Sequence, residues 1–129
     1  MAYTSDEAGQ LNVYVRRFPS AEGLSKVSIA GGTQPRWRSD GKEMFYLAAD
    51  GKLMAVEVKA SSRATPSIEL EAPVTLFDAR ISADLGVSFP FNYDVTGDGK
   101  RFLIITTAVA ATSQPPLTVW INWVETLRK

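Results

Sequence analysis

The chain has 129 residues, of which 45% are hydrophobic, and its formal net charge is zero because 14 basic residues balance 14 acidic ones. This size and composition suit one small folded domain, and the charge balance provides no basic field for binding nucleic acid. Histidine and cysteine are absent, which excludes disulfides, thiol or imidazole catalysis and the usual zinc sites.

The sequence contains no pattern for membrane insertion or export. Its longest apolar runs, at 102–107 and 117–121, are far shorter than the roughly 20 residues of a membrane helix. The first ten residues are polar and acidic, unlike the basic and then apolar pattern of a signal peptide. We expect no membrane insertion, and the residues alone leave the localisation unknown.

The first half of the chain predicts short β-strands separated by turns. Residues 11–18 and 24–29 alternate apolar and polar side chains, as half-buried strands do. Two Asp-Gly pairs then separate three further β-type runs, at 35–38, 43–48 and 52–58. Asp-Gly favours hairpin turns because both positions tolerate a positive φ. We therefore expect these three runs to form an antiparallel meander.

The second half predicts more strands and almost no helix. Residues 59–73 are rich in Ala, Ser, Thr and Pro, which favours a long surface loop, interrupted by a short strand at 67–70. A second hairpin is expected around the turn TGDGK, and at most one helical turn near the end of the sequence. The strands expected in this half lie at 67–70, 74–78, 91–95, 101–107 and 117–123.

Two parts of the chain repeat each other. Aligning PRWRSDGKEMFYL with YDVTGDGKRFLII superposes the Asp-Gly-Lys turns at 40–42 and 98–100, which are 58 residues apart. The alignment pairs Trp37 with Val95, Phe45 with Leu103 and Leu47 with Ile105. A second alignment, at an offset of 43, pairs Val13 with Val56 and Val15 with Val58. The two offsets differ by about the length of the 59–73 loop, so the unit has about forty residues, which is typical of a β-propeller blade.

The segments YTSDEAGQLNVYVRRF, GGTQPRWRSDGKEMFYLAADGKLMAVEV, TLFDARI, YDVTGDGKRFLI and LTVWINW resemble the last blades of bacterial TolB-like, WD-like β-propeller repeat proteins. The resemblance covers nearly the whole chain. It is strongest to the propeller at the C-terminus of some bacterial membrane-anchored serine/threonine protein kinases and of related periplasmic or surface proteins. The segment WRSDGK lacks the proline of the commoner Ser-Pro-Asp-Gly turn. The resemblance implies a location in the bacterial cell envelope or periplasm.

The predicted fold class is all-β: a partial β-propeller of about two and a half four-stranded antiparallel blades. One domain spans 1–129, with a partial blade at 1–30, a full blade at 31–80 and a partial final blade at 89–129. Closed propellers have about 4 to 8 blades, so we expect open edges at both ends and self-association through them. The sheet face expected to be uncovered carries Val13, Val15, Val27 and Ile29, or the residues opposite them.

Acidic residues in the turns are candidates for chemistry. Asp94, Thr96 and Asp98 begin a segment spaced like a calcium loop, but its twelfth position is Ile105 instead of a chelating Glu, so we expect a turn. Two carboxylates can act as acid and base in hydrolysis. The candidates for such a pair are Asp40, Asp50, Asp78, Asp94 and Asp98. Asp-Gly turns explain three of the five without a substrate. The sequence predicts no catalytic, cofactor-binding or metal-binding residue.

Arginine and tryptophan residues are the candidate contact residues. Arg36 and Arg38 flank Trp37 and could form a cationic and aromatic patch, as could Arg16-Arg17. Alternation favours Trp37 inside and both arginines in solvent. Trp120 and Trp123 are three positions apart, so they cannot share one face of a regular strand, and we expect one buried and one partly exposed.

The leading hypothesis for function is a non-catalytic scaffold or interaction module, the C-terminal part of a larger propeller that recognises a protein, a peptide or a cell-envelope component. An accessory or sensor domain of an enzyme, such as a kinase or peptidase, is the first alternative. The second is a carboxylate-dependent hydrolase that uses Asp94 and Asp98. We expect no cofactor and no nucleic-acid partner.

Overall fold

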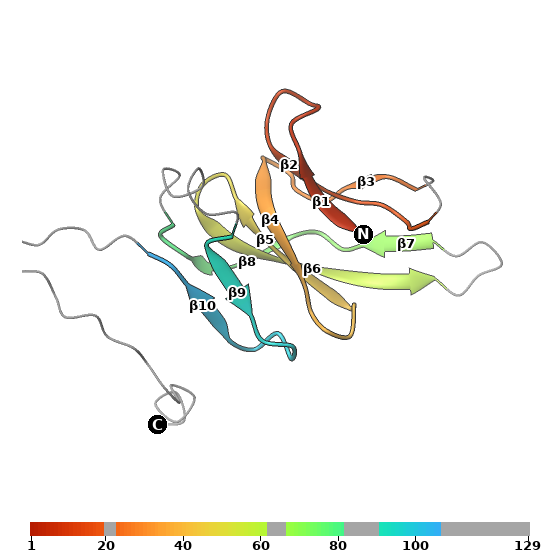
Figure 1. Cartoon of the computed structure of the whole chain (residues 1–129). Helices are drawn as coiled ribbons and strands as arrows, with labels where there is room; N and C mark the ends of the chain where they lie inside the picture. Colours follow the sequence, from red (N-terminus) through yellow and green to blue (C-terminus); the bar gives the residue numbers. More distant parts are fainter. Residues whose placement is uncertain (20–22, 62–66, 82–90, 107–129) are drawn as a thin grey trace, which may run out of the picture.

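The computed structural model describes residues 1–19, 23–61, 67–81 and 91–106 (Figure 1). Over these residues the fold is all-β, with ten strands and no helix. The strands form three antiparallel sheets, of three, five and two strands. The predicted all-β, antiparallel class is confirmed.

The first sheet has the order β1-β2-β3, with β1 at Ala2–Ser5, β2 at Asn12–Val15 and β3 at Ser25–Lys26. Its second and third strands lie within the predicted runs 11–18 and 24–29, but they are shorter. One cause is Ser28, whose hydroxyl accepts a hydrogen bond from the Val13 backbone N–H at 3.1 Å and donates one to Asn12 Oδ1 at 3.0 Å. A side chain therefore replaces a backbone carbonyl of the ladder at this point.

The central sheet contains β4 (Gly32–Trp37), β5 (Glu43–Ala48), β6 (Lys52–Ser61), β7 (Ser67–Leu70) and β8 (Val74–Asp78). Its order is β4-β5-β6-β7, and β8 also pairs with β6. The first half of β6 pairs with β8 and its last four residues pair with β7. The expected four-stranded sheet therefore has five strands. The expected loop is wrong at 59–61, because these residues extend β6.

The third sheet is the hairpin of β9 (Tyr93–Val95) and β10 (Phe102–Ile104). Its register repeats that of β4 and β5. Val95 lies opposite Phe102, and 58 residues earlier Trp37 lies opposite Met44. The expected strand at 117–123 lies outside the described residues.

Both faces of the central sheet are covered, so the three sheets stack (Figure 1). On one face, Met44, Tyr46 and Val56 pack with Val13, Val15 and Val27 of the first sheet. On the other face, a second cluster of Phe45, Leu47, Leu53 and Ala55 packs against Tyr93, with Val95, Phe102 and Ile104 at its margin. Coverage on both faces explains why four successive residues of β5, 44–47, are buried apolar side chains.

Two expectations about the first sheet are corrected. The face with Val13, Val15 and Val27, one of the two faces considered for the uncovered one, is covered: these residues are at most 5% exposed, whereas Ile29 is 73% exposed. The alignment at an offset of 43 is wrong as well. Val13 points toward the central sheet and Val56 points toward the first sheet, because both lie in the cluster between these two sheets. Equivalent positions of a repeat would point in the same direction along the stack.

Candidate functional site

A polar seam lies between β4 and the segment that leads into β9. The Asn92 backbone N–H donates a hydrogen bond to Gln34 Oε1 at 2.7 Å, and the Tyr93 hydroxyl donates one to the Gln34 carbonyl oxygen at 2.7 Å. Gln34 has a left-handed φ of 57° and lies where the register between β4 and β5 shifts. This bulge places both acceptors of Gln34 against the third sheet.

Arg36 lies two residues further along the same seam. Its guanidinium carbon is 4.0 Å from the centre of the Phe91 ring, and Nε is 3.8 Å from Asp94 Oδ1. Nε is buried and forms no hydrogen bond with the described residues. The side chain as a whole is 35% exposed, so part of it is accessible from outside the seam.

Asn92 adds a second unpaired polar group to the seam. The residue is 1% exposed, and neither its side-chain nitrogen nor its oxygen has a hydrogen-bond partner in the described part of the chain. The neighbouring Tyr93 is also buried, and burial raises the pKa of its hydroxyl well above the ordinary value. The phenol therefore stays neutral and acts as a hydrogen-bond donor to Gln34.

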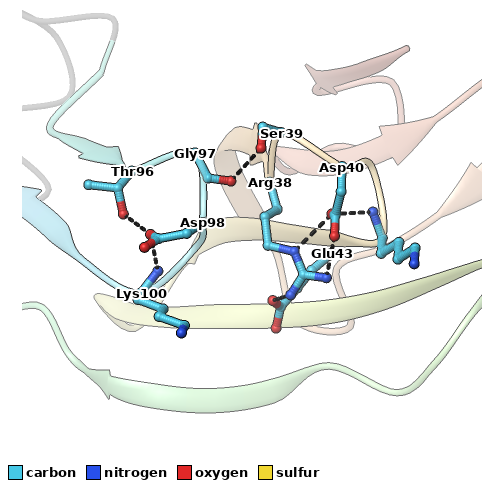
Figure 2. Close-up of polar contacts among 9 residues, drawn as sticks. Arg38, Ser39, Asp40, Glu43, Thr96, Gly97, Asp98 and Lys100 are labelled. Atoms are coloured by element: carbon cyan, nitrogen blue, oxygen red, sulfur yellow. Dashed lines mark hydrogen bonds and ion pairs between the residues drawn. The ribbon is translucent and has the colours of Figure 1, made fainter.

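Arg38 forms the charged end of the seam at the first Asp-Gly turn (Figure 2). Its Nε and Nη2 donate to Asp40 Oδ1 and Oδ2 at 2.8 and 2.7 Å, and Nη1 donates to Glu43 Oε2 at 2.8 Å. Asp40 Oδ1 also accepts the Lys42 backbone N–H at 2.9 Å. The hydrogen bonds from Arg38, followed by that from Lys42, lower the pKa of Asp40 to about 2.

The Asp-Gly turn at 98–99 packs against the Asp-Gly turn at 40–41, as Figure 2 shows. The backbone N–H and the hydroxyl of Ser39 both donate to the Gly97 carbonyl oxygen, at 3.1 and 2.6 Å. Gly99 lies so close to Arg38 that a Cβ on it would be 2.8 Å from Arg38 Cδ and 3.2 Å from Phe45 Cζ. A larger residue here would have to displace the Arg38 side chain, and the φ of 72° also favours glycine.

The acidic candidates for catalysis lie partly in turns and partly in strands: Asp40, Asp50 and Asp98 are turn residues, Asp78 ends β8 and Asp94 lies in β9. Asp50 Oδ2 accepts from Lys52 Nζ at 2.8 Å, and Asp78 Oδ1 accepts from the Arg80 backbone N–H at 2.9 Å. Asp98 accepts from the Thr96 hydroxyl and from the Lys100 backbone N–H. No group of three acidic side chains among residues 1–19, 23–61, 67–81 and 91–106 could hold a metal ion.

The structure locates two of the four predicted contact residues. Trp37 packs toward the first sheet, and Arg36 and Arg38 lie on the opposite face, as alternation predicts. The expectation that both arginines point into solvent is wrong, because the third sheet covers that face. Trp120 and Trp123 lie outside the described residues. Sequence reasoning missed Gln34 and Asn92, although the offset of 58 relates them.

Comparison with models of protein families, with curated proteins and with solved structures found no match. No helix long and apolar enough to cross a membrane occurs among the residues that the structure describes.

Proposed function

We propose that the chain is a non-catalytic β-propeller segment that acts as a scaffold or interaction module for a protein or peptide. The observation that supports this most strongly is the contact between repeated positions. Gln34 meets Asn92, Arg36 meets Asp94 and Ser39 meets Gly97, each 58 residues apart. Stacked sheets whose equivalent positions touch are what a radial repeat of blades requires.

The seam supplies the recognition chemistry of this proposal. Arg36 presents a partly exposed guanidinium stacked on an aromatic ring. A guanidinium donates hydrogen bonds to carboxylates and to peptide carbonyl groups. The carboxylates of the described turns are held by their own backbone and by neighbouring cations, which supports binding over hydrolysis.

Site-specific photocrosslinking in the protein's own cells tests this function. A photoreactive amino acid replaces Arg36 in one strain and Lys26, an exposed residue of β3, in the other. The proposal predicts a discrete crosslinked partner at position 36 that position 26 does not give. Equal crosslinking at both positions, or none at position 36, would contradict it.

A further inference from the structure

We propose that the outer edge of β10, together with the hollow beside it on the central sheet, binds an extended peptide strand with the residue pattern of β6. The proposal rests on the interaction function above and assigns it a second, separate surface. It commits to one kind of occupant, an unbound β-strand segment with alternating apolar residues.

The first observation is the hydrogen-bonding edge of β10. Thr96 N–H donates to the Arg101 carbonyl and Ile105 N–H donates to the Asn92 carbonyl, so residues 101 and 105 bond toward β9. Because backbone groups alternate along an antiparallel strand, the N–H and C=O groups of Phe102 and Ile104 point the other way. Within the described residues, no strand pairs with that side.

The second observation is the repeat. β10 corresponds to β5 at the offset of 58, and β5 has β6 as its outer neighbour. The Val58 N–H donates to the Lys42 carbonyl, and the paired positions Met44 with Val56 and Tyr46 with Met54 continue this ladder. A β6-like strand beside β10 would place its valine opposite Phe102 and its methionine opposite Ile104.

The third observation is the surface beneath that edge. Phe102 covers Phe45 and contacts Phe77, with ring centres 5.1 and 5.6 Å apart. The third sheet covers Phe45, which is 1% exposed, but it does not cover Val74, which is 62% exposed. Here the central sheet has a hollow of about 530 Å³, in which the apolar residues Ala55, Ala72, Val74 and Leu76 lie among four charged ones, Glu43, Glu57, Lys59 and Glu71.

An added strand of this type would lie over the hollow. In the central sheet, Met54 and Val56 of β6 point toward the first sheet. The matching side chains of a strand added to β10 would point the same way along the stack, toward the central sheet. They would bury exposed apolar surface on Val74 and Leu76. Such burial adds to the affinity that the backbone hydrogen bonds give in strand addition.

Charge favours this occupant as well. In the central sheet, two like charges, Glu43 and Glu57, lie opposite each other. The β10 counterpart of Glu43 is Arg101, which is exposed and forms no ion pair with the described residues. The glutamate of a β6-like strand would therefore meet an opposite charge, a favourable cross-strand pair.

The test uses a fluorescent peptide with the sequence of residues 52–58, Lys-Leu-Met-Ala-Val-Glu-Val, titrated with the whole 129-residue chain. We expect saturable binding. N-methylation of the peptide at the residues copied from Met54 and Val56, whose N–H groups face β10, abolishes binding. N-methylation at the residues copied from Leu53 and Ala55, whose N–H groups face away, preserves it. Absence of binding, or equal effects of the two methylation patterns, would overturn the proposal.

A charge-swap experiment fixes the register. Arg101→Glu weakens binding of the original peptide by about two- to fivefold, and changing the peptide's glutamate to lysine restores it. Lys26→Glu, on exposed β3, is the matched control and leaves both peptides unaffected. A loss that the charge-swapped peptide does not restore would contradict the register. Because these variants leave Arg36 intact, failure here is distinguishable from failure of the photocrosslinking experiment.

Discussion

The side chain of Gln34 accepts a hydrogen bond from the backbone of Asn92, the residue that occupies the same position one repeat later. The bond joins two neighbouring sheets at equivalent points of the sequence. The Asp-Gly turns at 40–41 and 98–99 are joined in the same way, through Ser39 and Gly97. The second and third sheets therefore pack with equivalent positions of the sequence repeat in contact.

Gln34→Ala tests how much this bond contributes. Gln34 is 8% exposed, and its loss leaves the Asn92 N–H unpaired in a buried place, which costs about 1–3 kcal/mol of unfolding free energy. Alanine retains the Cβ, so the strain of the left-handed backbone is unchanged. Urea unfolding measures the effect, with Gln10→Ala at an exposed turn as the control. Equal stabilities of the two variants would contradict the role of the seam.

Acid sensitivity follows from Asp40. Its pKa is lowered to about 2 in the folded chain, below its usual value near 3.8. Its contribution to stability is therefore present above about pH 4 and is lost as the pH falls toward 2. Asp40→Asn makes stability less dependent on pH in this window. Urea titrations at pH 5, 3 and 2 measure the slope, and an unchanged slope would refute the assignment.

Substitutions of Gly99 and Gly41 separate the cost of backbone strain from the cost of a packing clash. Both have a positive φ, 72° and 70°, but a Cβ at Gly41 meets nothing within 4 Å, whereas one at Gly99 meets Arg38 and Phe45. Gly41→Ala costs about 1 kcal/mol from the backbone alone. Gly99→Ala costs about 1–3 kcal/mol more, because the contact must shift. Thermal unfolding of both variants measures this difference, and equal losses would show that the turns do not pack.

Self-association is expected from the outer face of the third sheet. Leu103 and Ile105 correspond to the buried Phe45 and Leu47, yet they are 76% and 46% exposed. We expect the mass measured by light scattering to rise between micromolar and millimolar concentration, and Leu103→Lys to reduce the rise. Ile29→Lys, which changes a 73% exposed residue elsewhere, is the control. A constant mass near 14.1 kDa would contradict the expectation.

Local sequence signals predicted most of the strands. The runs at 43–48, 67–70 and 74–78 coincide with β5, β7 and β8, because Asp-Gly turns and β-branched or aromatic residues act over a few positions. The offset of 58 also predicted the shared register of the two hairpins. Such signals are local, so the sequence alone can reveal them.

Features that depend on the neighbouring sheet could not be predicted from the sequence. Alternation places Arg36 opposite Trp37 but does not reveal that another sheet covers the arginine face. The roles of Gln34 and Asn92 depend on a bulge in β4 and on contacts across the seam, and neither has a local pattern. β6 pairs with both β7 and β8 because it is ten residues long. Its length was not predicted, because the Ala- and Ser-rich composition after residue 58 is typical of a loop.

The most direct test of the repeated stack is a nuclear Overhauser experiment on the isotope-labelled chain. The account predicts cross-peaks between the Asn92 amide proton and the Gln34 side chain, and between the Ser39 amide proton and Gly97, because these groups are hydrogen-bonded neighbours. If the β4–β5 and β9–β10 hairpins each form but both cross-peaks are missing, the sheets do not pack by repeat position, and the propeller proposal loses its structural basis.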